Sequence, residues 1–187
     1  MSHGTLFPVV FLCALGVGCI RSKPPVSIGP ISPASVSNTQ PVTPAYNPDL
    51  HATLAPPLGW TLDIKTPEKP NVRHHVWVSP SGHTAFGVMK FSLPIPSPHD
   101  PVLWIFLSEM RRSEGAAELI SKVSDRDLRG IRFEAEGGRY RIRTNFTIRG
   151  LTGWMVYAGT LIDHPVDEPE LQEAVTAREA VQFGKLK

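Results

Sequence analysis

Cysteine, a dominant charge and long apolar runs are all scarce in this sequence. Both cysteines, Cys13 and Cys19, precede residue 20, so the rest of the chain cannot build a disulfide scaffold, a Cys-ligated zinc site or a Cys nucleophile. Lys and Arg total 19 and Asp and Glu total 17, a balance that argues against a nucleic-acid partner. The sequence also has no GxGxxG or Walker motif, which disfavours Rossmann and P-loop folds.

An apolar N-terminus is the first feature that is present. Residues 6–18 read LFPVVFLCALGVG, and as a helix they would span about 20 Å, short of the roughly 30 Å hydrocarbon core of a bilayer. This length suits the apolar region of a signal peptide better than a permanent membrane span. Gly16 and Gly18 are small enough to let an extended backbone enter a narrow peptidase groove just before Cys19. We therefore interpret residues 1–18 as a signal peptide.

The motif LGVGC (Leu15 to Cys19) resembles the lipobox of bacterial lipoproteins. The family usually has its leucine where this chain has Gly16, and the opening MSHGT lacks the usual Lys or Arg. The resemblance implies that Cys19 is lipidated as the first residue of the mature chain. It also implies lipid anchoring to the bacterial cell membrane or outer membrane, facing the periplasm or exterior. An ordinary secretory signal, or an apolar N-terminus with an incidental cysteine, are the alternatives.

Proline dominates the next segment. Nine prolines fall between residues 21 and 57, among many Ser, Thr, Asn and Gln residues. Proline removes amide donors and fixes φ, so neither a helix nor a strand ladder can propagate. We predict that residues 19–53 form a disordered tether after the lipidated Cys19, partly in the polyproline II conformation. The alternative is a Pro-rich ligand for a groove-binding partner.

Hydrophobic periodicity predicts one folded domain over residues 54–187. Alternating apolar residues indicate strands, and 3.6-residue periodicity indicates helices. Asp100 is the expected N-cap of the first helix, with Pro101 at its first position and Gly115 at its stop. The expected strands are 60–65, 72–78, 84–93, 131–135, 140–148 and 154–162, and the expected helices are 101–112, 116–123 and 170–181.

The best-specified element is the hairpin around Gly137 and Gly138. If these two residues form the turn, Glu136 lies opposite Arg139 and Glu134 lies opposite Arg141. Apolar and charged residues then occupy opposite faces of both strands. The element order predicts an α+β fold, with a mostly antiparallel sheet of about six strands flanked by helices.

This order resembles the PsbP-like fold, an α/β sandwich. The matching features are an opening strand at Gly59 and Trp60, a central helix after a Pro-rich loop, long late strands and a closing helix. The resemblance covers residues 58–187. It implies a binding or assembly role without catalysis, and it carries over no functional residue.

Arginines mark the candidate binding site. Arg132, Arg143 and Arg149 project from one strand face, and the predicted register assigns none of them a carboxylate partner. Because guanidinium groups suit carboxylates and phosphates, these three residues could bind an anion, a lipid headgroup or an envelope protein. The alternative is a solvated face, or one covered by the acidic C-terminal helix.

Other polar residues do not assemble into a recognisable catalytic motif. Ser79, Ser81 and His83 lie close in sequence, but SPSGH reads as a turn rather than a nucleophile elbow. His75 and His83 could converge, yet catalytic zinc needs three protein ligands. No metal or cofactor is therefore expected. Trp77 and Trp104 could be exposed interaction anchors.

The function predicted from the sequence is a membrane-anchored extracytoplasmic lipoprotein. Its folded domain is expected to be non-catalytic and to bind an unknown envelope protein or anionic ligand. A periplasmic hydrolase and a purely structural envelope protein are the alternatives. An exposed patch around Trp77 or Trp104 would favour binding, and a pocket with buried, perturbed titratable groups would favour the enzyme.

Overall fold

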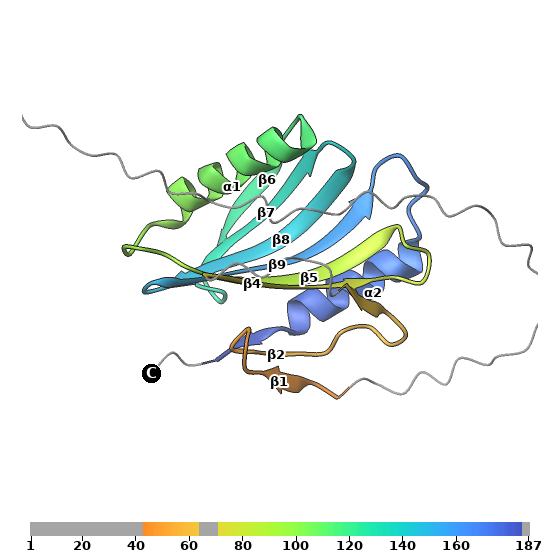
Figure 1. Cartoon of the computed structure of the whole chain (residues 1–187), viewed down its shortest axis with the longest axis horizontal. Coiled ribbons are helices and arrows are strands. Elements are labelled where there is room, and N and C mark those ends of the chain that lie inside the picture. The colour runs from red at the N-terminus through yellow and green to blue at the C-terminus, as the bar shows by residue number, and fades with distance from the viewer. Residues whose placement is uncertain (1–42, 64–70, 185–187) are drawn as a thin grey trace, which may run out of the picture.

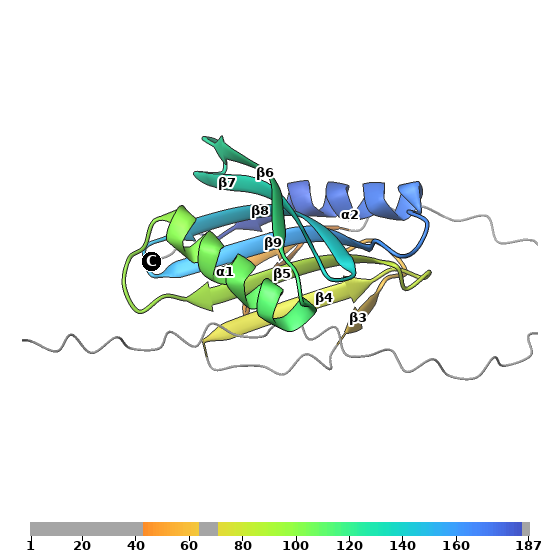
Figure 2. The ribbon, with the colours of Figure 1, turned by 90° about the horizontal axis from the view of Figure 1, so that it is seen from above.

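The computed structural model describes residues 43–63 and 71–184. A seven-stranded, wholly antiparallel sheet forms the centre of the domain (Figure 1). Helix α1 (His99–Glu114) covers one face and helix α2 (Glu168–Ala180) covers the other, as the two views together show (Figure 2). In spatial order the strands are β3 (Thr61–Asp63), β4 (Val72–Val78), β5 (Thr84–Ser92), β9 (Thr152–Leu161), β8 (Tyr140–Arg149), β7 (Gly130–Gly137) and β6 (Glu118–Asp125).

This architecture confirms the predicted α+β fold. The sheet has seven strands rather than about six because most of the segment 116–123, expected to be helical, belongs to β6 (Glu118–Asp125). Pairing with β7 along most of its length overrides the local preference of this segment for a helix. Helix α1 begins at His99 after an N-cap at Pro98, so Asp100 lies in its first turn and is not the N-cap. Gly115 ends the helix with φ 79°, as predicted.

A small second sheet extends the domain on the side of α2. It consists of β1 (Ala45–Asn47), β2 (Ala52–Leu54) and β10 (Gln182–Phe183), in the order β1-β2-β10. Leu50, between β1 and β2, is completely buried, and its carbonyl accepts a hydrogen bond of 2.8 Å from the Trp154 indole.

The predicted tether is therefore too long at its C-terminal end. Residues 43–53 belong to the folded unit, because their leucine and alanine side chains contribute to its core and prolines are tolerated at the ends of short edge strands. The remainder of the predicted tether, residues 19–42, lies outside the described residues, as does the predicted signal peptide 1–18.

Each face of the central sheet has its own hydrophobic core. Five apolar side chains of α1 are buried against one face. Helix α2 buries only Ala174 and Ala177 completely, and these small side chains let it lie close to the other face. Leu171, Val175 and Val181 pack at the margin of this second core. The five α1 residues are Val102, Leu103, Phe106, Leu107 and Met110.

The predicted hairpin of β7 and β8 has the correct faces but the wrong register. Gly137 pairs with Tyr140, so the turn consists of Gly138 and Arg139. Gly137 lies in the strand, where a Cβ would be 2.5 Å from the carbonyl oxygen of Ala116, just after the end of α1. The shift places Glu136 opposite Arg141. It also places Glu134 opposite Arg143 and Arg132 opposite Asn145.

Two strand glycines are covered by aromatic rings. Gly87 of β5 pairs with Tyr157 of β9, and Gly153 of β9 pairs with Phe91 of β5. A Cβ at either glycine would overlap the ring of its cross-strand partner. These close approaches let the two central strands carry large aromatic side chains without opening the sheet.

Candidate functional site

The predicted site residues Arg132 and Arg143 both have carboxylate partners. The Arg132 guanidinium lies 2.5 Å from Asp125 and 3.0 Å from Glu179 on α2. Arg143 lies 3.8 Å from Glu134, its neighbour on β7. The prediction that neither arginine has a carboxylate partner is therefore wrong. It relied on the incorrect hairpin register, which did not place Glu134 opposite Arg143, and it could not include Glu179, which is distant in the sequence.

The ion pair of Arg132 stabilises the junction between the β6–β7 hairpin and α2. The backbone amide of Leu128 and the Arg132 guanidinium both donate to Asp125 and hold the pKa of its carboxyl below the ordinary value. The same contact raises the pKa of Arg132. Both groups therefore stay charged across the physiological pH range, and we assign this pair a structural role.

Arg149 lies apart from the other two predicted residues. It stands at the end of β8, where its guanidinium carbon is 5.6 Å from the centre of the Phe183 ring. The three arginines thus follow one face over much of the sheet instead of converging on one ligand. Anion binding by Arg132, Arg143 and Arg149 stays a prediction. Cys19, the predicted lipidation site, lies outside the described residues.

A cleft of about 230 Å³ opens beside the first turn of α2. Arg143 and Arg141 line its wall on β8, but Arg141 is held by Glu136 at 2.6 Å. Glu168 adds a further carboxylate. The cleft therefore lacks the excess positive charge of an anion site, and its remaining walls are largely apolar: Ala158, Leu161, Ile162, Val166 and Leu171.

The serine and histidine residues near this cleft are not arranged for nucleophilic catalysis. The Ser81 hydroxyl donates to Glu170 at 2.5 Å, and the Ser81 amide donates to the same carboxylate. Partial burial pushes the pKa of Glu170 upward, but hydrogen bonds from Ser81 and Ser79 outweigh it and leave the pKa below its ordinary value. A carboxylate kept ionised by hydroxyl donors fastens the β4–β5 turn to α2, and it is a poor general base.

The histidines of this region pair differently from the sequence-based suggestion. His83 stacks on His164, with ring centres 4.1 Å apart and planes 8° from parallel. His75 instead lies 5.9 Å from Trp77 and 3.5 Å from the Asn47 amide. His75 and His83 therefore make no joint metal site. Among residues 43–63 and 71–184, no group of three His, Cys, Asp or Glu side chains could hold a metal ion.

The sequence did not indicate a partly buried polar pair. His74 Nε2 lies 2.8 Å from the Tyr157 hydroxyl, across more than eighty residues of chain. Burial raises the pKa of Tyr157 above its ordinary value, so its hydroxyl remains protonated. The pair links β4 to β9 across the intervening strand β5. No local motif could have indicated it, because the two residues meet only through strand pairing.

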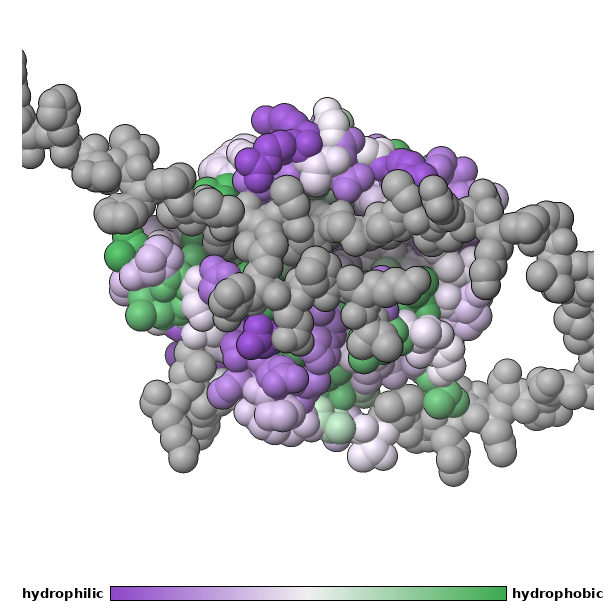
Figure 3. All heavy atoms as spheres, in the orientation of Figure 1, coloured by the Kyte–Doolittle hydropathy of each residue, from purple (hydrophilic) through white to green (hydrophobic). Residues whose placement is uncertain are grey.

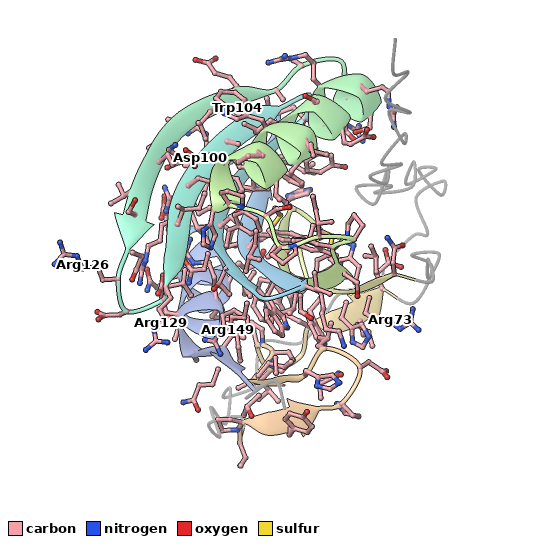
Figure 4. The ribbon with its side chains drawn as sticks, turned by 90° about the vertical axis from the view of Figure 1, so that its left-hand side faces the viewer. Arg73, Asp100, Trp104, Arg126, Arg129 and Arg149 are labelled. Carbon is pink, nitrogen blue, oxygen red and sulfur yellow. The ribbon has the colours of Figure 1, made fainter. Side chains whose placement is uncertain are left out.

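One of the two candidate tryptophan anchors is exposed. Trp77 is buried and stacks on Phe86, with ring centres 5.4 Å apart. Trp104 keeps 55% of its surface exposed on α1. Figure 4 shows Trp104 and Asp100 along the helix that lies beside β6 and β7. Asp100 forms an ion pair of 3.0 Å with Lys122 of β6, which ties the start of α1 to this edge strand.

Strand β6 is the edge of the central sheet next to Trp104. It pairs with β7 on one side and, within the described part of the chain, with no strand on the other. Ile120 and Val123 of this strand are 47% and 64% exposed. An irregularity between Leu119 and Ser121 interrupts the ladder. An exposed aromatic residue beside an open strand edge is suited to binding a protein segment.

Comparison with known proteins identifies the fold. No protein-family model matches the chain, and no curated protein matches it in sequence. The solution structure of cyanobacterial PsbP (CyanoP) from Synechocystis sp. PCC 6803 matches with a TM-score of 0.59 and 12% identity, over 83% of this chain and 99% of that one. The described domain therefore has a PsbP-like fold, as the element order predicted.

A second solved structure is a weaker match. A crystal structure from Bacteroides thetaiotaomicron VPI-5482 aligns with a TM-score of 0.40 and 12% identity, over 78% of this chain and 50% of that one. A similarity of this size supports no conclusion about fold or function. None of the helices in the described ranges has the length and apolar character needed to cross a membrane.

Proposed function

We propose that the chain is a lipoprotein anchored through Cys19 to the outer side of a bacterial membrane, and that its PsbP-like domain binds an envelope protein without catalysis. The N-terminal motif Leu15 to Cys19 supports the anchor. The hydrogen-bonding of Ser81 and the stacking of His83 support a non-catalytic role, because neither group is free to activate a nucleophile.

The exposed Trp104 beside the open edge of β6 carries the binding part of this proposal. Partner surfaces are enriched in tryptophan, and a free strand edge offers a row of backbone donors and acceptors. The Asp100–Lys122 ion pair holds α1 and β6 together at this edge. We infer that an extended segment of the partner pairs with β6 and places an apolar side chain against Trp104.

Hydrogen exchange of the β6 amides tests this surface. We expect exchange at Ser121 to Ser124 to be at least about tenfold slower in envelope vesicles than in the purified, detergent-solubilised chain, because a partner strand would protect edge amides that local opening otherwise exposes. Trp104→Ala should abolish the slowing. Leu62→Ala, which truncates a 38% exposed side chain on the opposite edge strand β3, should leave it intact.

Two results would contradict the assignment. One is equal exchange of the β6 amides in vesicles and in the purified chain. The other is slowing that persists in Trp104→Ala, which would place the partner elsewhere. Since Trp104 is largely exposed, its truncation should change the free energy of unfolding by no more than about 0.5 kcal/mol, so a folding defect would not obscure the comparison.

A further inference from the structure

Three connections meet at one end of the central sheet, and we call them the turn surface. They are residues 94–98 between β5 and α1, residues 126–129 between β6 and β7, and residues 149–151, which comprise the last residue of β8 and the turn into β9. The Leu93 amide donates to the Leu151 carbonyl at 2.7 Å. The Thr147 hydroxyl donates to the Arg129 carbonyl at 3.3 Å. One backbone and one side-chain hydrogen bond therefore hold these connections beside one another.

Apolar side chains project from the turn surface. Ile95 is 65% exposed and Leu151 is 49% exposed, although each lies next to residues that pack in the α1-side core. Figure 3 shows hydrophobic atoms gathered at the left-hand end of the molecule, where Figure 1 places the 94–98 connection and the β8–β9 turn. Most of the Ile95 side chain and about half of the Leu151 side chain therefore stay outside the core and are accessible at these turns.

Arginines without carboxylate partners flank these apolar side chains. Within the described ranges, no ion pair joins Arg126, Arg129 or Arg149 to an acidic side chain. Figure 4 shows Arg126 pointing away from the ribbon, with Arg129 and Arg149 at the same end of the sheet. Asp125 fixes the 126–129 turn by accepting from the Leu128 amide. Asp127 is the only acidic residue of these three connections.

The two ends of the sheet differ in charge. At the opposite end, the first turn of α2 carries Glu168 and Glu170 after an N-cap at Asp167, and Asp163 precedes them. A negatively charged surface would attract the turn surface and would be repelled by this acidic stretch at the start of α2. The turn surface therefore combines exposed apolar side chains with positive charge, whereas the start of α2 at the opposite end is acidic.

We propose that the turn surface docks on an anionic lipid bilayer, with Ile95 and Leu151 entering the interface and Arg126, Arg129 and Arg149 binding lipid phosphates. Arginine forks match phosphate oxygens, and protruding apolar turns can enter the headgroup region. This proposal rests on the proposed function, because an anchor at Cys19 would keep a bilayer within reach. Residues 20–42 span at most about 80 Å when extended.

A labelled chain tests the docking geometry independently of lipidation. The full chain would carry Cys13→Ser, Cys19→Ser and Leu151→Cys, with a polarity-sensitive dye on the new thiol. On vesicles containing phosphatidylglycerol and brominated acyl chains, we expect blue-shifted and quenched emission. The same dye attached through Ile162→Cys, at the opposite end and 44% exposed, should remain in water, as should the first label on phosphatidylcholine vesicles.

Arginine variants of the Leu151-labelled chain test the electrostatic part. Each arginine near an anionic surface contributes about a factor of five to the affinity for that surface. Replacing two of them, by Arg126→Gln with Arg129→Gln, should therefore raise the ratio of free to membrane-embedded label roughly 10- to 30-fold. Arg139→Gln, in the turn at the other end, should have less than about a twofold effect.

Three outcomes would overturn the docking proposal. They are a label at 151 that stays in water on anionic vesicles, an equal response from the label at 162, and insensitivity to loss of the two arginines. Because this chain lacks Cys19, its failure would leave the proposed anchor and the Trp104 surface standing. Conversely, a wild-type chain that proves not to be lipidated would leave vesicle docking by the turn surface measurable.

Discussion

Replacing Leu50 by alanine is expected to lower the free energy of unfolding by about 2–5 kcal/mol. Leu50 is completely buried in the α2-side core, although it lies in a Pro-rich segment whose composition is typical of a disordered tether. Truncation would leave a cavity beside β2 and α2 and remove packing from the loop that receives the Trp154 indole. Urea unfolding of the full chain would measure the loss.

Leu58→Ala provides the matched control for Leu50. Leu58 is 61% exposed, so its truncation should change stability by no more than about 0.5 kcal/mol. If Leu50→Ala were equally neutral, residues 43–53 would not be part of the folded unit, and the small sheet of β1, β2 and β10 would not contribute to its stability.

Replacing Cys19 by serine is expected to release the protein from membranes. Several acyl chains on one cysteine give stable anchoring, since each buried CH₂ contributes about 0.8 kcal/mol, whereas the unlipidated chain keeps only the short apolar segment 6–18. We expect the soluble fraction to rise at least about tenfold when cells are fractionated in high salt. High salt is needed because arginine–phosphate contacts of the turn surface are screened by ions.

Cys13→Ser is the control for this experiment, because Cys13 lies inside the apolar segment and is not the predicted lipidation site. Its membrane fraction should match that of the wild-type chain. Equal membrane retention of Cys19→Ser and wild type would contradict anchoring through Cys19, and the same loss from Cys13→Ser would show that the apolar segment itself is responsible.

Much of the fold could be predicted from the sequence because burial leaves a periodic signal. Alternation over residues 131–135 and 140–148 assigned the correct side chains to each sheet face. The 3.6-residue spacing also indicated helix α1, in which Val102, Phe106 and Met110 are buried and Ile105 lies at the margin of the core. Antiparallel order followed from short connections between consecutive strands.

The hairpin register could not be predicted from periodicity. Moving the pairing register by two residues leaves every side chain on the same face of the sheet. Turns at Gly137–Gly138 and at Gly138–Arg139 therefore fit the alternating pattern equally well. In the structure Gly137 pairs with Tyr140 and lies against the Ala116 carbonyl, a contact that depends on how the chain leaves α1. The alternating sequence pattern alone does not reveal this contact.

The candidate site was predicted least well because it depends on contacts between distant segments. Arg132 meets Glu179 across the junction with α2, and Arg149 meets the ring of Phe183 on β10. These contacts distinguish Arg132, which has carboxylate partners, from Arg149, which packs on an aromatic ring. Exposed Trp104 was one of two candidate anchors, and only tertiary packing shows that Trp77 is the buried one.

The intact mass of the wild-type chain, extracted from bacterial membranes with detergent, tests the central claim most directly. We expect a chain that begins at Cys19, has lost residues 1–18 and carries the additional mass of covalently attached acyl chains on its first residue. A chain that retains Met1, or one that is cleaved without any added lipid mass, would contradict the proposal that this PsbP-like domain is a membrane-anchored lipoprotein.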